Sequence, residues 1–214
     1  MARTNRSTQT RAGRPTQAES IQLDERLRQA AVDIFLEYGF EATSMEAVAR
    51  AAGITKRTLY ARYEDKDALF ADVIVWALER YHWSEPLMEH GQQDLAASLT
   101  AIARSALARA LDPDIVRLNR MAIIEAARVP EFASQTHSLT WSPRMQAVMG
   151  LLTAHESAGS VTVDDIEIAA EQFLAMVAAI PARLAAFGKI RSPQVQERHL
   201  QHAVKLFLRG VLPR

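Results

Sequence analysis

The sequence contains no cysteine among its 214 residues and no long uninterrupted run of apolar side chains. The lack of cysteine excludes disulfides, thiolate zinc sites and a cysteine nucleophile. No segment has the roughly 20 uninterrupted apolar residues of a membrane span. The basic N-terminus is not followed by the apolar stretch of a secretory signal. We therefore expect a cytoplasmic protein that has no membrane partner.

The formal net charge of the chain is zero, because 25 Lys and Arg residues balance 25 Asp and Glu residues. A basic excess over the whole chain, the usual feature of a non-specific nucleic-acid binder, is therefore missing. The charge is nevertheless uneven, since residues 1–18 contain four arginines and no acid. Residues 1–20 also carry almost no apolar side chains. We expect them to form a disordered basic arm that meets a polyanionic partner.

Helical periodicity dominates the rest of the chain. Apolar side chains recur at steps of three and four over residues 23–38, a pattern that predicts an amphipathic helix ended by Gly39. Further helices are predicted over residues 68–83, 94–111, 114–127, 131–154, 164–187 and 193–209, and no strand alternation exceeds a few residues near 160–163. The predicted fold class is all-α, with about nine helices. We expect a three-helix head over residues 21–70 and a larger helical body over residues 71–214.

Residues 43–63 have the pattern of a helix-turn-helix. Thr43 and Glu46 have the spacing of a capping box, Gly53 permits a sharp turn, and Thr55 can cap a second helix over residues 56–63. The outer face of this second helix carries cations, a hydroxyl and a phenol, which suit phosphate oxygens and base edges in a major groove. The alternative is a pair of core helices with a solvated charged face, which the helix–glycine–helix pattern alone favours.

The positions around this segment favour the DNA-binding interpretation. They follow one fixed register of residues: Leu27, Ala30, Ala31, Phe35, Gly39, Phe40, Thr43, Val48, Ala49, Ala52, Gly53, Ile54, Thr55, Leu59, Tyr60, Tyr63, Lys66, Leu69 and Phe70. This register closely resembles the N-terminal domain of the TetR/AcrR family of transcriptional regulators, over about residues 23–73. The resemblance implies a homodimeric DNA-binding regulator, usually a repressor, that binds a two-fold symmetric double-stranded operator.

The resemblance also implies which residues contact DNA. Arg57, Thr58 and Lys56 match positions near base edges, and Tyr60 matches a tyrosine that contacts a phosphate. Arg62 departs from the family's usual histidine or tyrosine, and a permanent charge there would strengthen phosphate binding. Lys66 matches a phosphate-binding lysine, although a plain surface lysine is an equal alternative. The full predicted set is Arg14 on the basic arm together with Thr43, Ser44, Thr55, Lys56, Arg57, Thr58, Tyr60, Arg62 and Lys66.

The body is expected to hold a dimer surface and an effector pocket. By the family resemblance, the last two helices pair between subunits through Phe173, Val177, Ile180, Leu184, Leu200, Val204, Phe207 and Leu208. Candidate pocket residues are Trp76, Leu99, Arg104, Met121, Ile124, Glu125, His137, Trp141, Met145, Met149, Phe173 and Met176. Met and Trp at helical spacing are more often simply core. Residues 120–132 resemble an AcrR-like branch, which implies a small hydrophobic or aromatic effector.

Enzymatic features are weak in this sequence. His199 and His202 lie three apart near Glu197, but no third metal ligand has convincing spacing, and a solvated helix face is the better explanation. No glycine-rich phosphate loop, Ser/His/Asp arrangement or nucleophile elbow is found. We expect no catalytic site, no metal and no cofactor. Two alternatives stay open: a regulator without a small ligand, and a carrier or enzyme that retains a vestigial helix-turn-helix.

Overall fold

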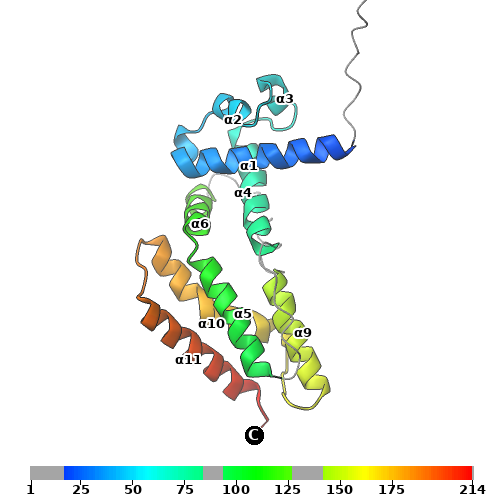
Figure 1. The fold of residues 1–214 in the computed structure, drawn as a ribbon, viewed down its shortest axis with the longest axis vertical. Helices are drawn as coiled ribbons and strands as arrows, with labels where there is room; N and C mark the ends of the chain where they lie inside the picture. The colour runs from blue at the N-terminus through cyan, green and yellow to red at the C-terminus, as the bar shows by residue number, and fades with distance from the viewer. Residues whose placement is uncertain (1–16, 84–93, 127–141, 214) are drawn as a thin grey trace, which may run out of the picture.

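The computed structural model describes residues 17–83, 94–126 and 142–213, and within these ranges the regular structure is entirely helical (Figure 1). This confirms the predicted all-α fold. With the labels of Figure 1, the helices are α1 (Gln17–Ala42), α2 (Met45–Ala51), α3 (Lys56–Tyr60), α4 (Lys66–Trp83), α5 (Leu95–Ala110), α6 (Pro113–Glu125), α9 (Pro143–Ser157), α10 (Ile166–Ala186) and α11 (Pro193–Val211).

Helix α1 begins at Gln17, so the prediction of disorder through residue 20 is wrong for residues 17–20. The reason is local, because Gln, Ala and Glu have high helix propensity and need no apolar partner to extend an existing helix. At the other end, Gly39 adopts φ 78 and ψ 173, which interrupts the helical geometry as predicted. The last turn, to Ala42, therefore lies beyond a kink.

Short polar side chains begin most of the later helices. The side chain of Thr55 accepts a hydrogen bond from the Thr58 amide at the start of α3, as predicted. Asp65 accepts one from the Ala68 amide at the start of α4. The prediction for α2 is wrong by one residue, because Ser44 is the cap and accepts from the Ala47 amide. Such caps satisfy backbone donors that have no partner within their own helix.

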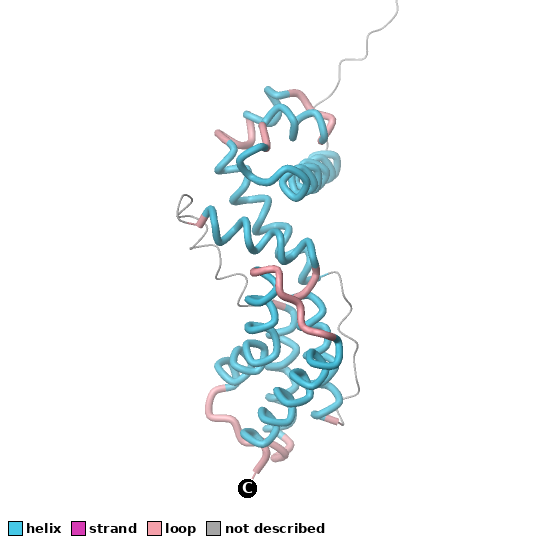
Figure 2. The backbone as a smooth tube through the Cα atoms, turned by 90° about the vertical axis from the view of Figure 1, so that its left-hand side faces the viewer, coloured by secondary structure: helices cyan, strands magenta, loops and turns pink. Residues whose placement is uncertain are grey.

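Two hydrophobic cores divide the molecule. The first joins α1, α2, α3 and α4 and is built around Phe35, Phe70 and Leu59. It continues past the expected head boundary at residue 70, because Ile115 and Leu118 of α6 are buried in it. The second core joins α5, α9, α10 and α11. In Figures 1 and 2 the head lies above the body, with α4 and α6 between them.

Helix α10 is long and apolar enough to cross a membrane by length and composition. However, it packs against α5, α6, α9 and α11, and Glu171 and Arg183 interrupt its apolar sequence. One such helix within a packed bundle does not indicate a membrane. Only 28% of its most apolar stretch is buried inside the monomer, so much of this helix still faces outward.

Candidate DNA-binding interface

The turn between α2 and α3 fixes the angle of the second short helix. Gly53 adopts φ 67, a conformation that favours glycine, and the Ile54 amide donates to the carbonyl of Ala49 at 2.9 Å. Val48 and Leu59 are fully buried and hold the two helices against α1 and α4. With its inner side fixed in this way, α3 presents its remaining side chains outward.

The outward face of α3 carries Lys56, Arg57 and Tyr60, all of which are exposed. Lys56 pairs with Glu46 of α2 and lies over the Tyr60 ring, 5.6 Å from its centroid. The hydrogen bond from Lys56 lowers the pKa of the Glu46 carboxyl, and the same bond raises the pKa of Lys56. None of the ion pairs found among the described residues involves Arg57, so its exposed guanidinium is available to a phosphate or a base edge.

Three other predicted DNA contacts have structural partners. Arg62 donates through Nε to Asp24 of α1 at 2.9 Å, so its charge is partly neutralised within the head. The ammonium of Lys66 donates to the carbonyls of Phe40 and Glu41 at 2.9 and 3.2 Å, near the end of α1. Thr43 is buried, and its hydroxyl donates to the carbonyl of Gly39 at 2.7 Å. These contacts favour a structural role for the three side chains.

The remaining residues predicted to contact DNA are Ser44, Thr55, Thr58 and Arg14. Ser44 and Thr55 are exposed at the starts of α2 and α3, where their hydroxyls act as caps. Thr58 is half-buried, and its hydroxyl lies 2.8 Å from that of Thr55. Arg14 lies outside the described residues. The structure thus brings Ser44, Thr55, Lys56, Arg57 and Tyr60 to one exposed surface, which we call the α2–α3 face.

One cluster in the head was missed by sequence reasoning. The guanidinium of Arg28 on α1 binds the Asp72 carboxylate of α4 through two bonds of 2.9 and 3.1 Å, and the Tyr63 hydroxyl donates to the same carboxylate at 2.5 Å. Burial and this hydrogen bond raise the pKa of Tyr63 to about 12. The cluster links α1, the segment after α3, and α4. The only sequence signal was tyrosine at a position where the resembled family commonly has phenylalanine.

The predicted pocket residues do not form one site. Leu99, Met145 and Phe173 are buried in the second core, and Met149 and Met176 pack against it. Trp76 and Met121 pack against the first core instead. Arg104 pairs with Glu197, Ile124 is 63% exposed, and Glu125 is buried. His137 and Trp141 lie outside the described residues.

A cavity of about 310 Å³ lies elsewhere, between α5, α6, α10 and the start of α9. Its polar lining consists of Arg109 of α5, Asn119 of α6, and Ser142 and Arg144 at the start of α9. Small alanine side chains of α5 and α10 form most of its apolar wall. The described residues that line it include none of the predicted ones. The prediction relied on methionine and tryptophan residues and therefore missed this site. The cavity exists because its walls carry small alanine side chains, which leave space that larger side chains would fill.

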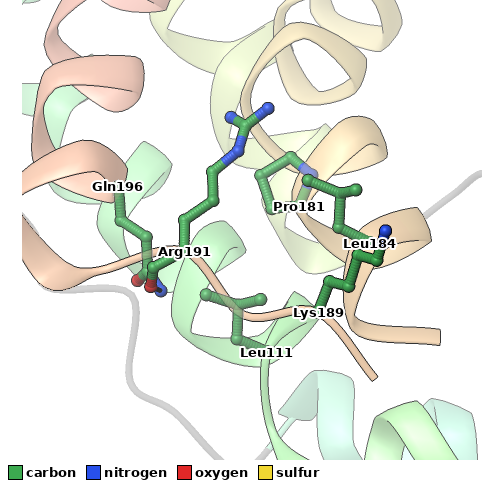
Figure 3. A pocket seen from close by; sticks show the side chains of 6 residues that line it. All are labelled: Leu111, Pro181, Leu184, Lys189, Arg191 and Gln196. Carbon is green, nitrogen blue, oxygen red and sulfur yellow. Dashed lines mark hydrogen bonds between the residues drawn. The ribbon is translucent and has the colours of Figure 1, made fainter. Parts of the chain in front are cut away.

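A second, narrower depression lies where the end of α5 meets α10 and the loop before α11. Leu111, Pro181, Leu184, Lys189, Arg191 and Gln196 surround it, as Figure 3 shows. It has no room for a water-sized molecule. It is therefore a seam between helices and not a ligand site.

Most of the predicted dimer residues lie inside the monomer. Phe173, Val177, Leu200, Val204 and Phe207 are buried in the second core, so the prediction that they form the dimer surface is wrong. Both long helices use these stripes to pack against each other and against α5. Leu184 and Leu208 are half-buried and Ile180 is 47% exposed. The strongest exposed apolar position on this side is Phe187, at 73%.

The described residues contain no group of three or more metal-ligating side chains. His199 is half-buried and its Nε2 lies 3.0 Å from the carbonyl of Val177, so it joins α11 to α10. His202 is exposed. His199 and Glu197 therefore have structural partners within the body, whereas His202 faces solvent.

Comparison with known proteins matches both parts of the chain. The pattern of bacterial regulatory proteins of the tetR family matches residues 27–73. The pattern of the AefR-like transcriptional repressor C-terminal domain matches residues 97–210, more than half of the chain. The chain belongs to the TetR family of transcriptional regulators. This confirms the family resemblance found in the sequence and extends it to the body.

Individual relatives agree with this assignment. The regulator AcrR of Shigella flexneri is 25% identical over 112 residues, which is 52% of this chain and only 51% of AcrR. A TetR-family regulator of Mesorhizobium loti has a similar structure, with a TM-score of 0.81, 25% identity, and coverage of 93% of this chain and 100% of that protein. The flavonoid-responsive regulator FrrA is 31% identical, with a TM-score of 0.71 and coverage of 90% and 98%. The chain thus spans about half the length of AcrR but nearly all of the two solved regulators.

Proposed function

We propose that this TetR-family regulator binds a two-fold operator as a cytoplasmic homodimer, represses transcription from it, and releases it when a small ligand occupies the body. The observation that carries the DNA half of the proposal is the α2–α3 face. It presents Arg57 and Tyr60 on a short helix whose inner side is fixed by Leu59. Cations and hydroxyl donors on such a helix suit phosphates and base edges. We propose no catalytic role.

Two copies of the head are needed because five residues of α3 offer few contacts. In operator binding by dimers, the two recognition helices lie about 34–36 Å apart and enter successive major grooves. The exposed Ile180 and half-buried Leu184 lie on one face of α10 four residues apart, and the exposed Phe187 follows three residues later at the end of the helix. This corrected α10 face is our proposed dimer surface. Exposed apolar patches of this kind commonly mark protein interfaces.

The cavity is our proposed effector site, and α4 is the proposed link from it to the head. Arg109, which lines the cavity, donates from Nη2 to the carbonyl of Leu78 in α4 at 3.1 Å. In turn, α4 carries Asp72, which binds Arg28 of α1. An occupant that shifts α5 or α6 therefore acts on the helix that holds the two heads in register. Release from DNA requires that the ligand bind more tightly to the conformation that does not bind the operator. A coupling free energy of about 1–3 kcal/mol between the two binding sites is typical.

The DNA-binding part of the proposal is tested by measuring affinity for the DNA directly upstream of the protein's own gene at several salt concentrations. A duplex of scrambled sequence is measured for comparison. We expect preferential binding and a two-fold footprint. Arg57→Gln should weaken binding and reduce the salt slope by about 1 per head, because one phosphate-neutralising cation is removed. Arg198→Gln, an exposed arginine of α11, is the matched control and should bind like the wild type. If a selection from random duplexes also enriches no sequence, the operator proposal fails.

The experiment for the ligand half begins with flavonoids, because FrrA, 31% identical over 90% of this chain, is a flavonoid-responsive regulator. Planar aromatic compounds should lower operator affinity when added to the preformed complex. An operator complex that keeps the same affinity with every compound that binds the body would favour a regulator without a small ligand. The dimer surface is tested separately, since Phe187→Asp should shift the sedimenting species toward monomer.

A further inference from the structure

The cations of α3 and of the two residues that follow it differ in their contacts. Lys56 pairs with the Glu46 carboxylate of α2, and Arg62 donates through Nε to the Asp24 carboxylate of α1 at 2.9 Å. None of the ion pairs found among the described residues involves Arg57. Two of the three cations between residues 56 and 62 therefore already have a negative partner within the head.

Lys56 is held at two points on the α2–α3 face. Its ammonium donates a hydrogen bond to Glu46, across the turn between the two helices, and lies 5.6 Å from the centroid of the Tyr60 ring. The hydrogen bond lowers the pKa of the Glu46 carboxyl and raises the pKa of Lys56, so both groups are charged at neutral pH. Both side chains are about half exposed. A DNA phosphate therefore reaches this ammonium only in competition with a carboxylate.

Arg62 is held in a similar way just after α3. Its Nε donates to Asp24, and its Nη1 donates to the carbonyl of Thr58 at 3.4 Å. The Arg62 side chain is 30% exposed, so a phosphate can still approach it. Because Asp24 lies on α1, that phosphate would have to replace a carboxylate carried by a different helix.

Such pairing has different consequences for the two kinds of DNA binding. Binding to DNA of any sequence comes from cations that neutralise phosphates, and each neutralised phosphate adds about 0.9 to the salt slope. A cation that keeps its carboxylate partner adds nothing to this sum. In a non-specific complex the protein slides until its free cations meet phosphates, whereas contacts to base edges fix one register on an operator. Freed cations should therefore strengthen non-specific binding more than operator binding.

We infer that Glu46 and Asp24 determine the specificity of this regulator for its operator. By holding Lys56 and Arg62, the two acids limit binding to DNA of any sequence. Arg57 is left as the α3 cation that makes contacts with DNA. The inference rests on the proposed function, because it names the residues that help the proposed DNA-binding face to distinguish an operator from other DNA.

The test measures the affinity of the full-length protein for a scrambled duplex at several salt concentrations. Glu46→Gln and Asp24→Asn should each bind this duplex about two- to five-fold more tightly than the wild type, the fold-change that corresponds to an exposed ion pair. Each should also steepen the salt slope by up to about 1 per head, because one more cation neutralises a phosphate. If neither variant steepens the slope, the inference is overturned.

The same variants are measured on the operator, taken from the upstream DNA or from selection among random duplexes. Operator affinity should rise by less than affinity for the scrambled duplex, so the ratio of the two affinities falls. An equal rise on both duplexes would show that the acids weaken all DNA binding alike, and it would overturn the specificity role.

Glu64→Gln is the matched control for a simple change of charge. Glu64 is an exposed acid between α3 and α4, and none of the ion pairs found among the described residues involves it. Its removal changes the net charge as Glu46→Gln does but frees no paired cation, so the salt slope should stay at the wild-type value. A slope as steep as that of Glu46→Gln would attribute the effect to net charge and overturn the inference.

A double variant identifies the cation that Glu46 holds. Glu46→Gln combined with Lys56→Gln should return the slope on the scrambled duplex to the wild-type value, because the freed ammonium is gone. Lys56→Gln alone should reduce that slope by less than Arg57→Gln does. Circular dichroism checks that each variant is folded. A double variant as steep as Glu46→Gln would contradict the pairing.

Failure of this inference can be told apart from failure of the proposed function, because affinity for a scrambled duplex is measured without an operator. A protein that prefers its operator, but whose non-specific binding does not respond to either acid, keeps the proposed function and loses the inference. A protein whose non-specific binding responds to both acids, but for which selection enriches no sequence, keeps the limit on non-specific binding and loses the proposed operator.

Discussion

The cluster of Arg28, Asp72 and Tyr63 allows a quantitative test of what holds α4 to the head. We predict that Tyr63→Phe destabilises the protein while leaving its ring packing intact, because phenylalanine lacks only the hydroxyl. That hydroxyl donates to the Asp72 carboxylate at 2.5 Å. A hydrogen bond to a charged group contributes about 1.5–3 kcal/mol. The Asp72 side chain is 36% exposed, so solvent screening lowers the expected loss to about 1–2 kcal/mol.

The measurement is urea unfolding at fixed protomer concentration, since the proposed dimerisation would make apparent stability depend on concentration. The corresponding fall in Tm is about 2–8 °C for a chain of this size. A double-mutant cycle of Tyr63→Phe with Asp72→Ala should recover a coupling of similar size, because the two groups contact directly.

Tyr60→Phe is the matched control. Its side chain is 43% exposed on the α2–α3 face, so removal of its hydroxyl should change stability by less than about 0.5 kcal/mol. The same variant should weaken operator binding if its hydroxyl contacts phosphate. The reasoning is refuted if Tyr63→Phe is as neutral as Tyr60→Phe and the cycle shows no coupling.

Three further results are expected. The folded-state pKa of Tyr63 is raised from 10.0 to about 12, so its contribution to stability is present below pH 10 and lost as the pH rises toward 12; Tyr63→Phe should flatten that part of the stability–pH curve. Gly53→Ala should cost about 1–2 kcal/mol in unfolding experiments because φ is 67, whereas Gly150→Ala, inside α9, should stabilise by about 0.5–1 kcal/mol; equal effects would contradict this. Removing Arg104 should change stability by at most about 1 kcal/mol, because its pairing with Glu197 is exposed; a larger loss by thermal melting would contradict that.

The head was the most predictable part of the chain because its signals are local. The positive φ of Gly53, the cap at Thr55 and the buried Leu59 depend on residues within a few positions of one another. The error at the start of α2 was also local. Thr43 and Ser44 are both good caps, and the choice between them depends on the carbonyl of Gly39, which receives the Thr43 hydroxyl.

Contacts between distant positions could not be predicted from the sequence. Arg28 and Asp72 lie 44 residues apart, and no spacing rule links a cation on one helix to an acid on another. Likewise, Lys66 and Arg62 match cations that a DNA-binding face would carry, yet their partners are carbonyls at the end of α1 and Asp24. Residue type alone does not distinguish a cation that binds phosphate from one that stabilises a helix end.

The dimer prediction failed for a related reason. Apolar stripes on α10 and α11 are wide, and a helix in a bundle buries one side within its own subunit before any side remains for a partner. Phe173 and Val177 are fully buried within the monomer, whereas Phe187 stays 73% exposed. The spacing of apolar residues in the sequence identifies the stripe. It does not show which of its residues are buried within the subunit and which stay exposed. The packing of α5 against both helices determines which of these residues are buried within the subunit.

The two cores provide a physical route for the proposed coupling between the head and the cavity. Helix α6 buries Ile115 and Leu118 in the core of the head, while the adjacent Asn119 lines the cavity. Arg109 makes a second connection, because it lines the cavity and donates to α4. Packed interiors transmit small displacements instead of absorbing them. Under the proposed function, a ligand that separates α5 from α6 would strain either the head core or the hydrogen bond from Arg109 to the carbonyl of Leu78 in α4.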